Sequence, residues 1–252
     1  MTGYKAVPAY ERPPIEEAIV QLRLAEPVPW TVATPGLAFA AIESTYPTSP
    51  EQQQELSATV GAEGTSGTGV KIQQGATRFL FKDNQFRRFA ILSDRIIAAG
   101  VRAPYTSWNE LRERVVDLAA RTSRIYGDSP RFSGVSIRYI NRVILPEGPV
   151  DTDEYFTTPV VTAGGGNKPF RSFMSQVETV LDEGRTCRVV FASLEPDERP
   201  GNHFLLDLDF GQQLQRASLK QALAQADELK NEENREFEDK ITDSARRLFV
   251  DG

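Results

Sequence analysis

The segment that decides the fold reads Ile15-Glu16-Glu17-Ala18-Ile19-Val20-Gln21-Leu22-Arg23-Leu24. Its even positions from 18 to 24 carry small or apolar side chains, whereas Glu17, Gln21 and Arg23 occupy odd positions. Successive side chains of a strand point to opposite faces of a sheet. The alternation therefore predicts a strand with one buried and one polar face.

A second strand of the same kind lies in the middle of the chain. Val135, Ile137 and Tyr139 share one face there, while Arg138 and Arg142 lie on the other. Asn141 falls on the apolar face, at a position where a core residue is expected. A buried amide at that position must find hydrogen-bond partners.

The elements that follow each of these strands occur in a similar order. The predicted elements after the first strand are a helix at 36–42, strands at 55–60, 77–81, 86–92 and 95–101, and a helix at 107–127 with a capping box at Ser107 and Glu110. Those after the second strand are a short helix at 151–156, strands at 173–181, 186–194 and 204–210, and a long charged helix from 219 to about 249.

This order predicts an α+β protein with two βαβββ(β)α-like halves, in which mainly antiparallel sheets are packed by long helices. We place the boundary near Ser129 and Pro130, so that residues 1–129 form the N-terminal half and residues 130–252 the C-terminal half. One fused domain is the alternative. If the halves arose by internal duplication, their first strands can lie beside a pseudo-twofold axis. Arg23, Arg138 and Arg142 would then converge near the junction.

Composition narrows the class of protein. The 252 residues carry a net charge of −6, which disfavours general binding to nucleic-acid backbones. One cysteine, Cys187, excludes an internal disulfide and favours a reducing compartment. No apolar run reaches the roughly 18 residues of a membrane helix. We therefore expect a cytoplasmic protein that does not insert into a membrane.

Several segments resemble sites but lack the required pattern. The glycine-rich stretches at 64–69 and 164–166 are not followed by the Lys and Ser or Thr of a phosphate-binding loop, so we expect no cofactor. His203, Asp207 and Asp209 share one strand face but span roughly 20 Å, too far for one metal ion. With one histidine in the chain, Cys187 has no convincing catalytic partner. We therefore predict no metal site and no catalytic residue.

The polar faces of the two first strands are the strongest candidate for a binding site. The candidate ligand-binding residues are Glu17, Arg23, Arg138, Asn141 and Arg142. Guanidinium forks suit carboxylate or phosphate groups, so a small anionic ligand is the matching ligand class. Alternatively, these charges solvate an exposed sheet or pair with one another to hold the two halves together.

The last helix carries a thin apolar stripe formed by Leu229, Phe237, Ile241 and Leu248. Such a stripe covers a sheet in most proteins. The alternative is that it contacts a protein partner or a second copy of the chain.

Three short motifs resemble a known family. They are the opening Arg12-Pro13-Pro14-Ile15-Glu16-Glu17-Ala18, the central Arg138-Tyr139-Ile140-Asn141-Arg142, and Asp207-Leu208-Asp209 before the charged helix. They resemble a sporadically distributed prokaryotic family of uncharacterised proteins of about 250 residues. The resemblance implies one shared architecture and a patchy, mobile-gene-like distribution, and it carries over no activity.

The leading functional hypothesis is a non-enzymatic binding or regulatory module of an accessory or defence-associated prokaryotic locus. It rests on the lack of a convincing nucleophile, metal cluster or cofactor loop in the sequence. One alternative is an enzyme or sensor acting on a small anionic ligand at the arginine-lined sheet face. The other is a nucleic-acid-binding protein, which the acidic balance disfavours.

Overall fold

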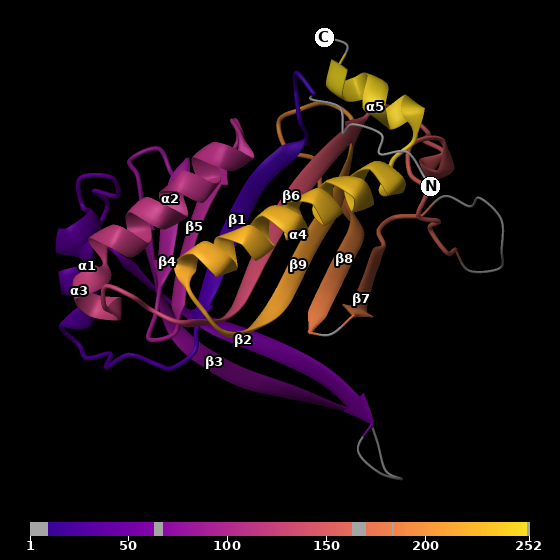
Figure 1. Ribbon diagram of the computed structural model, residues 1–252. Coiled ribbons are helices and arrows are strands. Elements are labelled where there is room, and N and C mark those ends of the chain that lie inside the picture. Colours follow the sequence, from indigo (N-terminus) through magenta and orange to yellow (C-terminus); the bar gives the residue numbers. More distant parts are fainter. Residues whose placement is uncertain (1–9, 63–67, 163–169, 183, 251–252) are drawn as a thin grey trace, which may run out of the picture.

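The computed structural model describes residues 10–62, 68–162, 170–182 and 184–250. Its strands form one nine-stranded sheet in the order β2-β3-β4-β5-β1-β6-β9-β8-β7. Each strand pairs with its neighbours in antiparallel fashion, and helices lie across the sheet (Figure 1). The predicted α+β class is confirmed. The glycine-rich segments at 64–67 and 164–166 lie outside the described residues.

The elements follow the predicted order. The strands are β1 (Ile15–Leu24), β2 (Glu51–Ala62), β3 (Thr68–Lys82), β4 (Arg88–Leu92), β5 (Ile96–Arg102), β6 (Phe132–Leu145), β7 (Met174–Asp182), β8 (Arg185–Leu194) and β9 (Asn202–Ala217). The helices are α1 (Thr34–Ile42), α2 (Trp108–Arg121), α3 (Ser123–Tyr126), the 3-10 helix η2 (Thr152–Glu154), α4 (Leu219–Lys240) and α5 (Asp243–Val250).

The first strands of the two halves lie side by side in the middle of the sheet. β1 pairs with β6 in a register that sets Val20 opposite Ile137 and Ile19 opposite Arg138. Val20 and Ile137 are fully buried, as the alternation predicts. The sheet continues across the predicted boundary, which falls between α3 and β6. Internal duplication stays a prediction.

The two long helices cover one face of the sheet, which we call the helix face; the other is the open face. The capping serine Ser107 accepts a hydrogen bond from the backbone nitrogen of Glu110 and starts α2 where the sequence predicts. In Figure 1, α2 lies over β5 and β1, and α4 lies over β6 and β9. The buried side chains of both helices and those on the helix face of the sheet form one hydrophobic core.

The last helix is shorter than predicted. α4 ends at Lys240 because Ile241 is extended and forms a bridge with Phe156, and α5 begins only at Asp243. The apolar stripe of this helix faces the core, whereas a surface that contacts a partner must be exposed. Leu229, Phe237 and Ile241 are buried in the core of the same chain. The predicted interface through this stripe is therefore wrong, and the stripe covers the sheet.

Within the described part of the chain, no helix combines the length and the apolar character that crossing a membrane requires.

Candidate functional site

Acidic and basic side chains alternate across the open face. Arg138 on β6 donates two parallel hydrogen bonds to the carboxylate of Asp207 on β9, from Nε at 2.9 Å and from Nη2 at 2.6 Å. Arg188 on β8 donates to Asp209 on β9 at 2.6 Å. Burial raises the pKa of Asp209, whereas the charges of Arg188 and Arg138 lower it. The arginine charges are thus matched by carboxylates of the same chain.

The same alternation continues toward the N-terminal half. Glu17 on β1 accepts a hydrogen bond from Nε of Arg102 on β5 at 2.8 Å. The charge of Glu17 also contributes to the raised pKa of Arg138, whose largest cause is the hydrogen bond to Asp207. Each of these hydrogen-bonded pairs joins strands of the same half, and only the electrostatic contact of Glu17 with Arg138 crosses between the halves.

Arg23, Arg138 and Arg142 lie on one face but do not converge. Arg23 lies opposite Gly134, four residues before Arg138 and eight before Arg142 on β6. At ~3.3 Å per residue these positions are about 13 and 26 Å away along the strand. The predicted convergence is wrong because antiparallel pairing puts the end of β1 beside the start of β6.

Asn141 is separated from the arginines because it lies on the helix face. It is buried, and its amide nitrogen donates to the carbonyl oxygen of Leu206 at 3.1 Å. The five residues predicted as one ligand-binding site therefore occupy both faces of the sheet and do not form one site.

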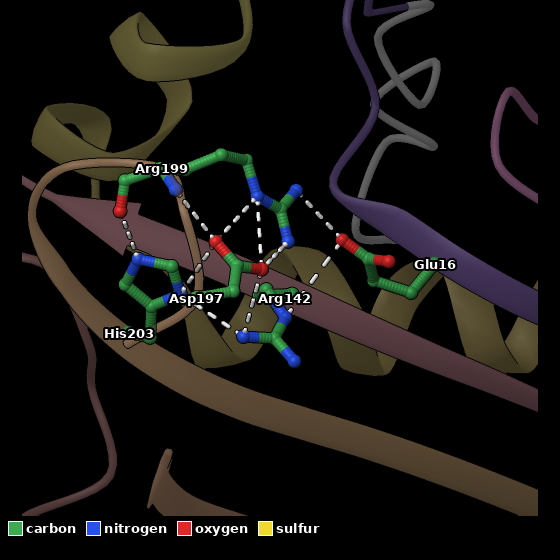
Figure 2. A network of polar contacts seen from close by, with 5 residues as sticks. All are labelled: Glu16, Arg142, Asp197, Arg199 and His203. Atoms are coloured by element: carbon green, nitrogen blue, oxygen red, sulfur yellow. Dashed lines mark hydrogen bonds and ion pairs between the residues drawn. The ribbon is translucent and has the colours of Figure 1, made fainter. Parts of the chain in front are cut away.

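Arg142 belongs to a separate polar network, which Figure 2 shows. Its Nη1 donates to Nδ1 of the buried His203 at 3.0 Å, and Nε2 of His203 donates to the carbonyl oxygen of Arg199 at 2.9 Å. Arg199 also binds Asp197 at 2.6 Å and Glu16 at 2.8 Å. Hydrogen bonds from Arg199 hold the pKa of Asp197 well below its usual range. The network fastens the β8–β9 connection to the start of β1.

A pocket of about 260 Å³ lies on the helix face, between α4, the first residues of β1 and the segment that leads into α2. Aromatic and aliphatic side chains form much of its wall, including Tyr10, Ile15, Trp108 and Phe237. Its polar lining includes Asn141, Lys230, Glu233 and Asn234. Both halves of the chain contribute, so the pocket exists only when β1, α2 and α4 are in place.

A buried ion pair lines this pocket. Lys230 Nζ donates to Glu233 Oε2 at 2.5 Å and to Asn234 Oδ1 at 2.7 Å. The ammonium also lies 3.7 Å from the centroid of the Tyr139 ring, an arrangement in which a cation is attracted to the ring face. The side chains of Lys230 and Glu233 are only 12% and 3% exposed. Burial raises the pKa of Glu233, and the charge of Lys230 opposes that shift.

Two tyrosines lie next to this ion pair: Tyr105 lines the pocket, and Tyr139 contacts Lys230. The hydroxyl groups of Tyr105 and Tyr139 are 3.0 Å apart, and their rings pack edge to face. Burial raises the pKa of Tyr105 to about 12 and raises the pKa of Tyr139 well above its usual value. Both phenols therefore stay protonated at neutral pH and act as neutral hydrogen-bonding groups.

Sequence reasoning missed the ion pair because the segment from Lys230 to Lys240 resembles a solvated helix. A signal was present, however. Glu233 is four residues from both Leu229 and Phe237, so it lies on the same helix face as these core residues. An acid within an apolar stripe predicts a buried charge, which needs a partner.

The other reactive groups that the structure describes form no second site. Burial raises the pKa of the Cys187 thiol to about 12, so the thiolate is scarce at neutral pH. Among the described residues, no group of three or more His, Cys, Asp or Glu side chains is arranged to hold a metal ion.

Comparison with known proteins adds little to this geometry. The chain matches no protein-family model, and no curated protein matches it. One similar solved structure is the crystal structure of DynU16, a protein of the dynemicin biosynthetic locus. The two share 15% sequence identity over 77% of this chain and 86% of that chain, with a TM-score of 0.16. A TM-score this low supports no argument about fold or function.

Proposed function

We propose that this protein is a non-enzymatic binding or regulatory module that holds a small organic molecule in the pocket under α4. The observation that carries this proposal is the buried pair of Lys230 and Glu233, which lines a pocket with aromatic walls. Ligand sites commonly combine an apolar wall with a few placed polar groups. The motifs that resemble a prokaryotic family add the hypothesis of an accessory or defence-associated locus.

The size and wall of the pocket define the ligand class. A volume of about 260 Å³ lies just below the ~300–1,000 Å³ of pockets for drug-sized ligands, so a single-ring molecule fits best. The rings of Tyr10, Trp108 and Phe237 offer offset or edge-to-face contacts to an aromatic ligand. Asn141 and Asn234 add polar groups that can orient it.

The charges favour a neutral ligand. Lys230 and Glu233 neutralise each other at 2.5 Å. Glu238, which also lines the pocket, binds Arg246 at 2.7 Å and accepts a hydrogen bond from Tyr10 at 2.5 Å. An anion or a cation would meet a matched pair instead of a free opposite charge. An anionic ligand at the open face meets the same obstacle, because Arg138 is already bound to Asp207.

The polar groups suit binding better than proton transfer. General acid–base catalysis is most efficient when the catalytic pKa lies near the operating pH. The phenol of Tyr105 has a pKa of about 12, far above the operating pH, and the ammonium of Lys230 already donates hydrogen bonds to Glu233 and Asn234. Both groups are therefore suited to hydrogen bonding with a ligand.

The proposal predicts that neutral aromatic amides bind and that blocking the pocket abolishes the binding. The probes are benzamide and 4-hydroxybenzamide, with benzoate and benzamidine as charged counterparts. Calorimetric titration should give saturable binding of the neutral pair, at least about tenfold tighter than the charged pair, or about 1.4 kcal/mol.

Asn234→Phe, which fills the pocket from α4, should remove this binding. Asn231→Phe is the matched control, because Asn231 is an exposed residue on the same helix and does not line the pocket. Equal binding by both variants, or no binding of the neutral probes to the unmodified protein, would refute the proposed function.

A further inference from the structure

The strand β7 forms an edge of the sheet and is exposed along its whole length. Among the described strands it pairs with β8 alone. Its residues are exposed on both faces, including Met174 at 74%, Val177 at 55% and Val180 at 75%. Figure 1 shows no helix over it. An exposed apolar edge strand presents unpaired backbone groups to another strand.

We propose that β7 is the contact through which two copies of this chain associate, by antiparallel pairing of β7 with β7 across a twofold axis. Such pairing joins the two sheets into one continuous sheet. An interface between identical copies on a twofold axis uses the same patch twice, so the strand must be complementary to itself.

The sequence of β7 is complementary to itself in one register. A twofold axis perpendicular to the sheet keeps equivalent faces on the same side, so opposite residues must share a face. Centring the axis on Val177 sets Met174 opposite Val180, Ser175 opposite Thr179 and Gln176 opposite Glu178. The two methyl-bearing Val177 side chains then meet on the axis.

Charge selects this register over its neighbour. Centring the axis on Glu178 would place the two Glu178 carboxylates opposite each other, which is unfavourable. In the register centred on Val177, each Glu178 faces an amide of Gln176, a neutral hydrogen-bonding partner. Within its own chain, Glu178 lies opposite Arg188 on β8, so an arginine faces it there and not a second acid.

Apart from Glu178, the paired part of the strand lacks the usual features that keep an edge unpaired. Between Met174 and Val180 it carries no Lys and no Pro. Its register irregularity lies between Val180 and Asp182, beyond the residues that pair in the proposed dimer. Seven residues from each copy form a contact smaller than the ~1,600 Å² of a standard interface. We therefore expect a weak dimer that depends on concentration, with a Kd on the order of 10–100 μM.

Sedimentation equilibrium of the full chain between about 5 and 500 μM tests the proposal, because this range brackets the expected Kd. The unmodified protein should shift from monomer to dimer. Val177→Lys, which sets two ammonium groups against each other on the axis, should weaken association by more than about tenfold. Val32→Lys is the control. It makes the same change at a fully exposed residue that is distant from β7 in the sequence, and it should leave association unchanged. Circular dichroism checks that both variants fold.

Cross-linking tests the register. Directly opposite residues of an antiparallel pair have Cα atoms ~4.5–5.5 Å apart, within the ~4.4–6.8 Å that a disulfide spans. Under mild oxidation, Val177→Cys should form a covalent dimer, and Gln176→Cys should cross-link with Glu178→Cys but not with itself; neither of these two positions lies opposite the native Cys187, which faces Thr179. A protein that stays monomeric at 500 μM, or a dimer that Val177→Lys leaves intact, would overturn the proposal. If the edge binds only a peptide of another protein, the chain should stay monomeric at 500 μM.

Discussion

Replacing Arg138 with Met is expected to lower the free energy of unfolding by about 3 kcal/mol at neutral pH. The change removes both hydrogen bonds to Asp207 and leaves that carboxylate without its cation. Because the side chain of Asp207 is only 5% exposed, water cannot fully replace the lost partner. Removing one partner of a buried pair costs ~3–5 kcal/mol in general. We expect the lower end because the side chain of Arg138 is 39% exposed, so water can reach the vacated site.

Two further variants separate the stranded charge from other causes. The double variant Arg138→Met with Asp207→Leu should recover most of the loss, because it leaves no unpaired charge. Arg188→Met acts on a more exposed pair, at 37% and 25%, and should cost only about 1 kcal/mol. Urea unfolding gives these values. Equal losses for Arg138→Met and the double variant would show that the unpaired carboxylate of Asp207 does not cause the loss.

Replacing Lys230 with Met is expected to destabilise the protein by about 3 kcal/mol at pH 7, with a loss that shrinks toward acid pH. Burial raises the pKa of Glu233, and in the native protein the charge of Lys230 opposes the shift. Without Lys230 the burial effect acts alone, and the folded state binds a proton more readily than the unfolded state. The penalty is full above the folded pKa of Glu233 and vanishes below its unfolded pKa of ~4.3.

Unfolding titrations of Lys230→Met between pH 4 and 8 measure this effect. Lys240→Met is the matched control on the same helix, because its ion pair with Glu236 is about 30% exposed on both sides. That variant should cost less than about 1 kcal/mol and show little additional pH dependence. A loss for Lys230→Met that is constant over this pH range would mean that Glu233 is not a buried, titrating partner.

The strands and their faces could be predicted from sequence because alternation is a local signal. The pattern from Ala18 to Leu24 fixes which side chains are buried, and Ser107 with Glu110 fixes the start of α2. The break at Ile241 could not be predicted in this way. It depends on the bridge to Phe156, a contact between segments distant in sequence.

The site was harder to predict because strand alternation gives the face of a residue but not its position along a neighbouring strand. Arg23 and Arg142 were assigned to the correct face, yet the antiparallel register separates them. The partners of Arg138 and Arg142 come from β9 and the β8–β9 connection, which no local pattern joins to β6. The pocket likewise requires α4 to pack on β6 and beside α2, near the first residue of β1.

The central claim, that the pocket under α4 binds a neutral aromatic ligand, can be tested directly by NMR. The chain has two tryptophans, and of these Trp108 lines the pocket with its indole N–H bound to Asp227 at 2.8 Å. Trp30 packs instead near Phe79 and Tyr126. Titration with 4-hydroxybenzamide should shift the indole N–H resonance of Trp108 saturably and leave that of Trp30 in place. Equal shifts of both resonances, or an unmoved Trp108 resonance at millimolar ligand, would contradict the claim.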